Sequence, residues 1–209
     1  MVKEDPVPLT RRLVGIAAAA AAAFFTVPAA AGQADVLAQS SCTPAPASPV
    51  FLPWGDPASY ALVPGGDMEG SLAGWTLAGG AAATGGSETY GVTGSVGSSS
   101  LSLPAGAGAL SPVSCVNVPN PSVELFTRSD TPGATLTVWA VLQRTNGNTL
   151  NVPVGSVSTS SSWQPSGPLT FTPPQANKNG NLLIALAFQA VGGSIQVDDT
   201  YVDPWIRCC

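Results

Sequence analysis

The chain has 209 residues, 44% of them hydrophobic and only 9% charged, and its formal net charge is −5. Because no basic excess exists, nucleic acid and anionic membrane surfaces are poor partners. Histidine is absent, which excludes the Ser-His-Asp and Cys-His catalytic arrangements and removes the usual nitrogen ligands of zinc and copper.

The first 34 residues have the pattern of a secretory signal peptide. Two arginines precede an alanine-rich apolar run at residues 13–25, and a stretch of small residues follows at 29–34. This is the order of a positive region, a hydrophobic region and a cleavage site. We expect residues 1–34 to be removed by cleavage after Ala34, or else after Ala31, and the mature protein to be secreted.

A membrane anchor is the rival interpretation of the same run. The run is shorter than the ~20 residues that a spanning helix needs, and Pro28 follows it closely. We therefore expect no membrane attachment after cleavage. Residues 10–14, Thr-Arg-Arg-Leu-Val, also resemble a twin-arginine signal, so export by either the Sec or the twin-arginine route remains open.

Residues 35–58 form a proline-rich lead-in to the folded domain. Five prolines lie between Cys42 and Pro57, a density that no helix or central strand tolerates. We expect an extended segment that packs on the domain through Phe51 and Trp54.

The remainder, residues 59–209, reads as one all-β domain. Short apolar runs alternate with Gly, Pro, Ser and Asn, and residues 144–149 (Arg-Thr-Asn-Gly-Asn-Thr) give the strongest hairpin signal. Many short strands with regular turns indicate a sandwich or a barrel. The predicted strands are residues 60–63, 74–77, 89–92, 100–103, 109–116, 122–128, 135–144, 149–154, 169–172, 182–189 and 194–202.

Several short motifs follow one another along the chain in an order that is typical of a known fold. They are Gly-Asp-Met-Glu-Gly at 66–70, Gly-Trp at 74–75, a serine-rich strand at 97–103, Ser-Ser-Trp at 161–163 and Val-Asp-Asp-Thr-Tyr-Val at 197–202. This order resembles the galactose-binding-like jelly roll of many carbohydrate-binding modules. The resemblance implies a two-sheet antiparallel β-sandwich over residues 60–202, and a fold of this kind implies no activity by itself.

The lead-in carries a second resemblance. Residues 51–57, Phe-Leu-Pro-Trp-Gly-Asp-Pro, follow a leading cysteine and precede the sandwich. In this the mature chain is similar to a family of small secreted bacterial proteins of unknown function.

All four cysteines lie beyond the signal, and an even count in an exported chain indicates disulfides. The neighbours Cys208 and Cys209 have Cα atoms about 3.8 Å apart, below the usual disulfide range of about 4.4–6.8 Å. We favour the pair Cys42–Cys115. The last two cysteines are then free, vicinally bonded, or joined to a partner chain.

Aromatic residues on the predicted strands suggest a sugar-binding platform. Trp139 lies on the face of its strand opposite Leu136, Val138, Ala140 and Leu142, because alternate residues of a strand share a face. In the preceding strand Glu124, Phe126 and Arg128 also share a face. If the two strands pair, Trp139, Phe126, Glu124 and Arg128 form a ligand-binding platform. The alternative is that Trp139 lies in the core.

Two acidic stretches predict a metal site. Asp67 and Glu69 share one side of an extended segment near the start of the domain, and Asp198 and Asp199 lie in its last strand. Clustered carboxylates without a cation would repel, whereas Ca²⁺ takes 6–8 oxygen ligands. We expect a structural Ca²⁺ site of Asp67, Glu69 and Asp198, with Asp199 as the alternative ligand to Asp198. The alternative is that these acids are solvated turn residues.

The sequence thus predicts a secreted, non-catalytic binding module for an extracellular or cell-wall glycan. The second hypothesis is a structural or adhesive surface protein that works through protein contacts, including a disulfide-linked partner at Cys208 or Cys209. The third is a carbohydrate-active enzyme that uses two carboxylates, which would have to lie about 5–9.5 Å apart in a cleft.

Overall fold

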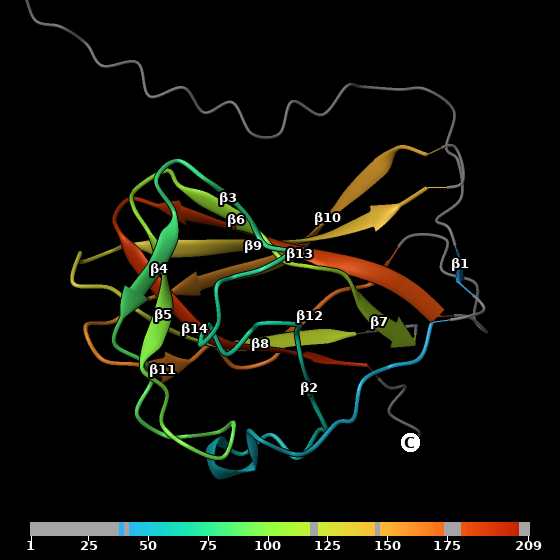
Figure 1. The fold of residues 1–209 in the computed structure, drawn as a ribbon, viewed down its shortest axis with the longest axis horizontal. Helices are drawn as coiled ribbons and strands as arrows, with labels where there is room; N and C mark the ends of the chain where they lie inside the picture. Colours follow the sequence, from blue (N-terminus) through green and yellow to red (C-terminus); the bar gives the residue numbers. More distant parts are fainter. Residues whose placement is uncertain (1–37, 40–41, 118–120, 145–146, 174–180, 205–209) are drawn as a thin grey trace, which may run out of the picture.

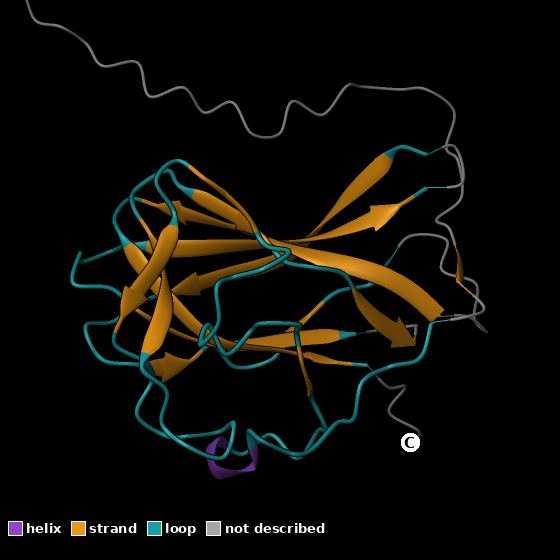
Figure 2. Ribbon diagram, in the orientation of Figure 1, coloured by secondary structure: helices purple, strands orange, loops and turns teal. Residues whose placement is uncertain are grey.

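The computed structural model describes residues 38–39, 42–117, 121–144, 147–173 and 181–204 (Figure 1). The predicted signal peptide and the terminal cysteines Cys208 and Cys209 lie outside these residues. In the described part the chain forms two antiparallel sheets joined by loops, with one short 3-10 helix, η1 at Leu52–Trp54 (Figure 2). None of the described helices has the length and hydropathy to span a membrane.

The first sheet has seven strands, five of them in the order β10-β9-β13-β6-β3, while β1 and β7 also pair with β13. Its central strand, β13, is the long ribbon that crosses the middle of Figure 1. The strands are β1 (Ala38–Gln39), β3 (Thr76–Ala78), β6 (Gly108–Leu110), β7 (Ser114–Asn117), β9 (Thr135–Gln143), β10 (Thr149–Ser158) and β13 (Asn181–Val191).

The second sheet also has seven strands, in the order β11-β8-β14-β5-β4, with β12 paired to β8 and β2 paired to β14. Its central strand is the last one, β14. The strands are β2 (Ala61–Leu62), β4 (Ala82–Gly85), β5 (Ser99–Leu103), β8 (Ser122–Arg128), β11 (Gln164–Pro165), β12 (Leu169–Thr170) and β14 (Ile195–Asp203).

The main core lies between the two sheets, and strand alternation selects its residues. In β9 every second residue is buried, and Trp139 belongs to the other set, whose side chains are half-buried or exposed. The alternative that placed Trp139 in the core is therefore wrong. The facing side chains are Leu136, Val138, Leu142, Ile184, Leu186 and Phe188 from the first sheet, and Leu101, Leu103, Val123, Leu125, Ile195 and Val197 from the second.

A second hydrophobic cluster covers the outer side of the second sheet. Phe51 is fully buried and stacks on Phe126 of β8 with ring centroids 5.7 Å apart, and it meets Tyr201 of β14 edge-on at 5.5 Å. Tyr60 and Trp163 complete the buried cluster. The proline-rich lead-in thus packs on the second sheet, on the side away from the first (Figure 1).

The disulfide Cys42–Cys115 is confirmed, with Cα atoms 5.8 Å apart. It joins the start of the lead-in to β7, which pairs with β13. The lead-in is therefore fixed at both ends, by the covalent bond at Cys42 and by the ladder of β2 with β14.

The all-β prediction is confirmed, and so is the hairpin, since β9 and β10 pair through the turn that Arg144 closes with Asn148. Two strand predictions were wrong. The run 109–116 is broken by Pro112, which has no N–H to donate, and becomes β6 and β7. Residues 89–92 form a turn, because the Glu88 carboxylate accepts hydrogen bonds from the backbone N–H groups of Tyr90, Gly91 and Val92.

Candidate functional site

The outer face of the first sheet carries no charge on its strands. No Asp, Glu, Lys or Arg occurs in any strand of the described part of this sheet, whereas the second sheet holds Glu124, Arg128 and three aspartates. The outward side chains of β9, β10 and β13 are instead uncharged, and many of them carry hydroxyl or amide groups. Examples are Thr135, Thr137, Gln143, Asn151, Ser156 and Gln189.

Trp139 lies in the middle of a row that crosses this face. The strand registers place Pro153 on one side of it and Ala187 on the other, followed by Leu110 and Thr76. Ala187 faces outward in this row and yet is only 1% exposed, so its larger neighbours cover it. The row gives the sheet a continuous apolar strip about Trp139.

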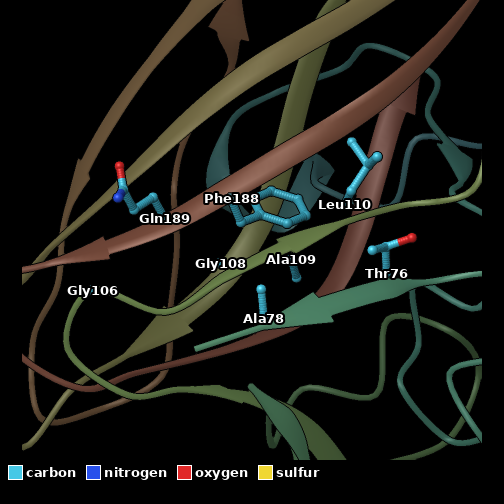
Figure 3. Close-up of a pocket in the computed structure, with 8 residues that line it drawn as sticks. All are labelled: Thr76, Ala78, Gly106, Gly108, Ala109, Leu110, Phe188 and Gln189. Atoms are coloured by element: carbon cyan, nitrogen blue, oxygen red, sulfur yellow. The ribbon is translucent and has the colours of Figure 1, made fainter. Parts of the chain in front are cut away.

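A pocket opens at the far end of this row, over β3, β6 and β13 (Figure 3). Its volume is about 160 Å³. Small residues form its floor, and Leu110, Thr76 and Gln189 border it. Gly108 is required there, since a Cβ at this position would lie 2.9 Å from the Phe188 carbonyl oxygen. The lining residues are Thr76, Ala78, Gly106, Gly108, Ala109, Leu110, Phe188 and Gln189.

The predicted four-residue platform is not assembled. Phe126, Glu124 and Arg128 lie on β8 in the second sheet, whereas Trp139 lies on β9 in the first. The two strands are consecutive in sequence but do not pair, because the chain crosses between sheets at the turn around Pro132. Only Trp139, of these four, lies on the uncharged face.

Phe126 has a structural environment. It is fully buried, and the rings of Phe51, Trp54 and Tyr90 all lie close to its own, at centroid distances of 5.7, 5.3 and 5.4 Å. No face of its ring is left for a sugar. The side chain that the sequence offered as part of a ligand platform is thus the anchor of the lead-in.

Glu124 is buried beneath the lead-in as well, at 1% exposure. Burial raises its pKa to about 7, and the neighbouring Asp56 carboxylate adds to the rise. Asp56 in turn accepts a hydrogen bond of 2.6 Å from the Tyr60 hydroxyl. Glu124 therefore holds a proton more readily than a surface glutamate and is inaccessible to a large ligand.

The two acidic stretches lie side by side, because β2 pairs with β14 and the ladder continues beyond it. The N–H of Val63 donates to the Thr200 carbonyl at 3.0 Å, and the N–H of Thr200 donates to the Gly66 carbonyl at 2.9 Å. Asp67 therefore lies near Asp198 and Asp199. Gly66 has no room for a side chain here, since a Cβ would come within 2.6 Å of the Thr200 carbonyl oxygen.

Asp198 is fully buried and well satisfied. It accepts hydrogen bonds of 2.8 Å from the Ser87 hydroxyl and from the Glu88 N–H, and one of 2.9 Å from the Asp199 N–H. Burial nevertheless raises its pKa to about 6, against the opposing effect of these donors. Both carboxylate oxygens are thus committed to hydrogen bonds within the protein.

Asp199 lies beside it in the left-handed conformation, with φ at 44°, where the β14 ladder is interrupted. It is 3% exposed. Burial raises its pKa to about 9, and the rise is increased by Asp198, by a hydrogen bond with Glu88 and by Asp67. The raised pKa favours the protonated form of Asp199, which can donate the hydrogen bond to the Glu88 carboxylate.

Glu88 is the member of this acidic cluster that sequence reasoning missed. It is fully buried and contacts both halves of the cluster, through its own N–H to Asp198 and its side chain to Asp199. The signal in the sequence was a single glutamate within a Gly/Ser-rich run. We define the acidic cluster as Asp67, Glu88, Asp198 and Asp199.

Glu69 is not part of the acidic cluster. Its carboxylate accepts hydrogen bonds from the N–H groups of Ser98 and Ser99, at 2.6 and 2.7 Å, and from the Ser98 hydroxyl at 2.8 Å. These donors lower its pKa, the Ser99 N–H most of all. Glu69 thus caps the start of β5. Within the described ranges, no three His, Cys, Asp or Glu side chains are grouped as they would be around a metal ion.

No protein-family model matches the chain, and no curated protein matches it. Solved structures do. The chain is similar to the CBM22-1 xylan-binding domain from Paenibacillus barcinonensis Xyn10C, with 17% identity and a TM-score of 0.46 over 65% of this chain and 88% of that one. That domain is a carbohydrate-binding module, the class that the sequence motifs resemble.

Two further modules show the same likeness. One is TmCBM61 in complex with beta-1,4-galactotriose, at 13% identity and a TM-score of 0.41 over 67% of this chain and 94% of that one. The other is the family 11 module of the cellulosomal cellulase Lic26A-Cel5E of Clostridium thermocellum. Its identity is 13% and its TM-score is 0.41, over 72% of this chain and 98% of that one. At these identities the likeness is one of fold alone.

Proposed function

We propose that this protein is a secreted, non-catalytic module that binds an uncharged extracellular or cell-wall glycan on the outer face of its first sheet. The observation that carries the proposal is the position of Trp139, which is half-buried on the outer side of a sheet whose described strands carry no charge and lies in one row with the pocket over β3, β6 and β13.

The chemistry of this face suits a sugar chain. A pyranose ring presents apolar C–H faces, which pack on flat or small apolar side chains, and hydroxyls, which require hydrogen-bonding partners at the border. Trp139 and Leu110 supply the apolar surface, and Thr137, Gln189 and Thr76 supply hydroxyl and amide groups beside it. The described strands of this sheet carry no basic side chain that would pair with a carboxylate or sulfate.

The non-catalytic part of the proposal is supported by the burial of the acids. Carboxylate catalysis on a glycan needs two carboxyl groups in a cleft that admits the substrate. Asp198, Asp199 and Glu88 are 0%, 3% and 0% exposed, and Glu124 is 1% exposed, so no sugar reaches these four groups without unfolding part of the domain. Asp67 is half-buried and Glu69 is exposed, but the Glu69 carboxylate is occupied by hydrogen bonds from Ser98 and Ser99.

The adhesive alternative has one observation in its favour. Leu52 of η1 is 56% exposed and Tyr90 is 45% exposed, and both lie over the second sheet, where Tyr90 packs on Trp54. Exposed apolar side chains of this kind occur at protein contacts. Such contacts would use the opposite side of the molecule from Trp139.

A panel of insoluble and soluble neutral polysaccharides, assayed by pull-down and affinity electrophoresis, tests the glycan proposal. The wild type should bind at least one, and Trp139→Ala should lose at least about tenfold in affinity, equivalent to about 1.4 kcal/mol. Leu52→Ala, which removes an exposed side chain from the other side, is the matched control and should bind as the wild type does. Equal binding by Trp139→Ala would refute the site.

We also propose that the acidic cluster binds Ca²⁺ in a structural role. Every neighbouring charge that acts on Asp199 is negative, and Ca²⁺ prefers carboxylate and carbonyl oxygens. Asp67, Glu88 and Asp199 would hold the ion, and since the described side chains are not grouped around one point, they would have to move together to bind it. The buried Thr200 hydroxyl, which has no hydrogen-bond partner, is a further oxygen in the same stretch.

Thermal melting separates this proposal from the glycan proposal, since no sugar is present. The midpoint should be higher in millimolar calcium than in excess chelator at neutral pH, because an ion that binds only the folded state stabilises it. Magnesium demands near-octahedral geometry and gives up its bound waters reluctantly, so it should have a smaller effect. Identical midpoints in calcium and in chelator would remove the site.

A further inference from the structure

A row of polar side chains crosses the second sheet where β8 ends and β14 begins. Gln196 of β14 pairs with Arg128 of β8 on one side and with Ser102 of β5 on the other, so the three side chains lie on the same, outer face of the sheet. Each is half-buried. No described hydrogen bond uses the Gln196 amide or the Ser102 hydroxyl, so these groups have hydrogen-bonding capacity left for a ligand.

The row lines a pocket of about 170 Å³. The turns that follow β8 and precede β14 supply Ser129, Asp130, Thr131 and Ser194 to the other walls, and β14 itself supplies Ile195. We call this the Arg128 pocket. It differs from the pocket over β3, β6 and β13 in chemistry, since most of its lining side chains are polar, and in position, since it belongs to the other sheet.

Hydrogen bonds hold the walls of the Arg128 pocket in place. The Ser129 hydroxyl donates to the Ser194 carbonyl at 2.6 Å and accepts from the Thr131 N–H at 3.0 Å, which joins the two turns. Only Gly fits at 193, where a Cβ would come within 2.5 Å of the Thr131 side chain. The pocket is thus formed before any ligand arrives, which lowers the entropy cost of binding.

Arg128 forms the polar centre of the pocket. Its Nη2 donates to both oxygens of Asp130, at 2.8 and 2.9 Å. No described hydrogen bond uses Nε or Nη1, and the Asp130 side chain is 78% exposed. Guanidinium donors, carboxylate acceptors and the Gln196 amide therefore lie together with unused hydrogen-bonding capacity.

We propose that the Arg128 pocket binds one uncharged sugar residue, at the end of a glycan chain, through its vicinal hydroxyls. A vicinal diol both donates and accepts, which matches the combination of Asp130, Arg128 and Gln196. The positive charge of Arg128 is balanced by Asp130, so an anion gains little there. With no aromatic side chain in the lining, the ligand is held by hydrogen bonds in a pocket rather than stacked along a chain.

This second site is independent of the proposed function of the first sheet. Trp139 and Arg128 lie on opposite sheets, so one molecule could hold an internal stretch of one chain and the end of another. Two linked sites raise the apparent affinity for a surface that displays both kinds of target.

Titration of the full chain by NMR, with backbone amides observed, tests the proposal. The probes are methyl glycosides of neutral hexoses and pentoses, the corresponding uronic acids, and inorganic phosphate. At least one neutral glycoside should shift the amides of Ser102, Arg128 and Gln196 together, with saturation in the millimolar range. Gln196→Ala should weaken that binding at least about tenfold, and Trp139→Ala should leave it unchanged.

Three outcomes would overturn the inference. They are the absence of any saturable shift at these three amides with every neutral glycoside, shifts produced by phosphate or uronic acid alone, and unaltered binding in both Gln196→Ala and Ser102→Ala. The spectra of these variants show directly whether they are folded. Because Trp139→Ala affects only the first sheet, failure of the Arg128 pocket and failure of the glycan face give different results.

Discussion

At the scale of single residues, the main feature is Asp199, a buried aspartate with a raised pKa in the left-handed backbone conformation. Asp199 has φ at 44°, a region that asparagine and aspartate occupy more readily than other non-glycine residues. Its raised pKa arises from burial and from three neighbouring carboxylates. Ionisation of Asp199 therefore opposes folding.

Asp199→Asn tests this directly. The amide keeps the size and the backbone preference of the protonated acid and can still donate a hydrogen bond to Glu88, but it cannot ionise. In chelator the variant should gain stability relative to the wild type as the pH rises from 5 to 8, by up to about 1.4 kcal/mol per pH unit. Each 1 kcal/mol of that gain corresponds to about 2–4 °C in midpoint for a domain of this size. A variant that gains no stability relative to the wild type over this range would contradict the assignment.

The positions of Asp67, Asp198 and Asp199 could be anticipated from the sequence, because closure of the sandwich by its first and last strands brings them together. Glu88 and Glu69 could not be placed in this way. Glu88 enters from the loop between β4 and β5, and Glu69 turns to cap β5 through Ser98 and Ser99. Both contacts depend on the path of a Gly/Ser-rich loop, and no periodic pattern encodes that path.

At the scale of elements, the proline-rich lead-in forms a second core with the outer face of the second sheet. Phe51 is 0% exposed and touches rings from β8 and β14, while its neighbour Leu52 is 56% exposed. The start of the lead-in is held to the first sheet by β1 and to β7 by the disulfide at Cys42. The aromatic contacts of Phe51 attach its later part to the second sheet.

Phe51→Ala should lower the free energy of unfolding by about 3–5 kcal/mol, the range for truncation of a buried phenylalanine. Leu52→Ala should change it by less than about 0.5 kcal/mol, since it alters an exposed residue. Chemical denaturation of both variants provides the comparison. Similar small losses in the two would mean that the lead-in contributes little to the fold.

The disulfide acts on the same element. Cys42 and Cys115 are separated by 73 residues, so the bond restricts a long loop of the unfolded chain. In the chain-entropy account this is worth about 4 kcal/mol. The double variant Cys42→Ala, Cys115→Ala should unfold at correspondingly lower denaturant concentration, with its sheet content retained by circular dichroism. A loss below about 1 kcal/mol would contradict the entropic account.

Strand identity was easier to predict than strand pairing. Alternation in β8 and β9 gave both strands and the outward face of Trp139. It could not show that the two strands belong to different sheets, because a short turn at residues 129–134 serves a hairpin and a crossover equally well. For this reason the prediction that Trp139 and Phe126 form one platform was wrong. The burial of Phe126 was also hard to foresee, because the lead-in that covers it lies far earlier in the chain.

At the scale of the whole molecule, the two sheets differ in charge. The first carries no charged residue on its described strands, and the second holds three buried acids with raised pKa values, Asp198 at about 6, Glu124 at about 7 and Asp199 at about 9. A group whose pKa is higher in the folded state binds its proton more tightly there. Its contribution to stability is therefore present below the unfolded pKa and is lost as the pH rises through the folded value.

The wild type in chelator should accordingly be most stable near pH 4, close to the unfolded pKa values of these acids, and become less stable as the pH rises to 9. Each proton released only on unfolding contributes up to about 1.4 kcal/mol per pH unit to the decline. Glu69, whose pKa is lowered, opposes this trend only at acid pH. Urea denaturation across this range measures the effect, and stability that rises steadily from pH 5 to pH 9 would contradict the protonated state of the buried acids.

The central claim is that the uncharged outer face of the first sheet binds glycan, and amide chemical-shift mapping with an oligosaccharide of a bound neutral polysaccharide tests it most directly. The account predicts shifts of the Trp139 indole and of amides in β3, β6, β9 and β13, all of which disappear in Trp139→Ala. Shifts confined to the second sheet, or binding that survives Trp139→Ala unchanged, would contradict it.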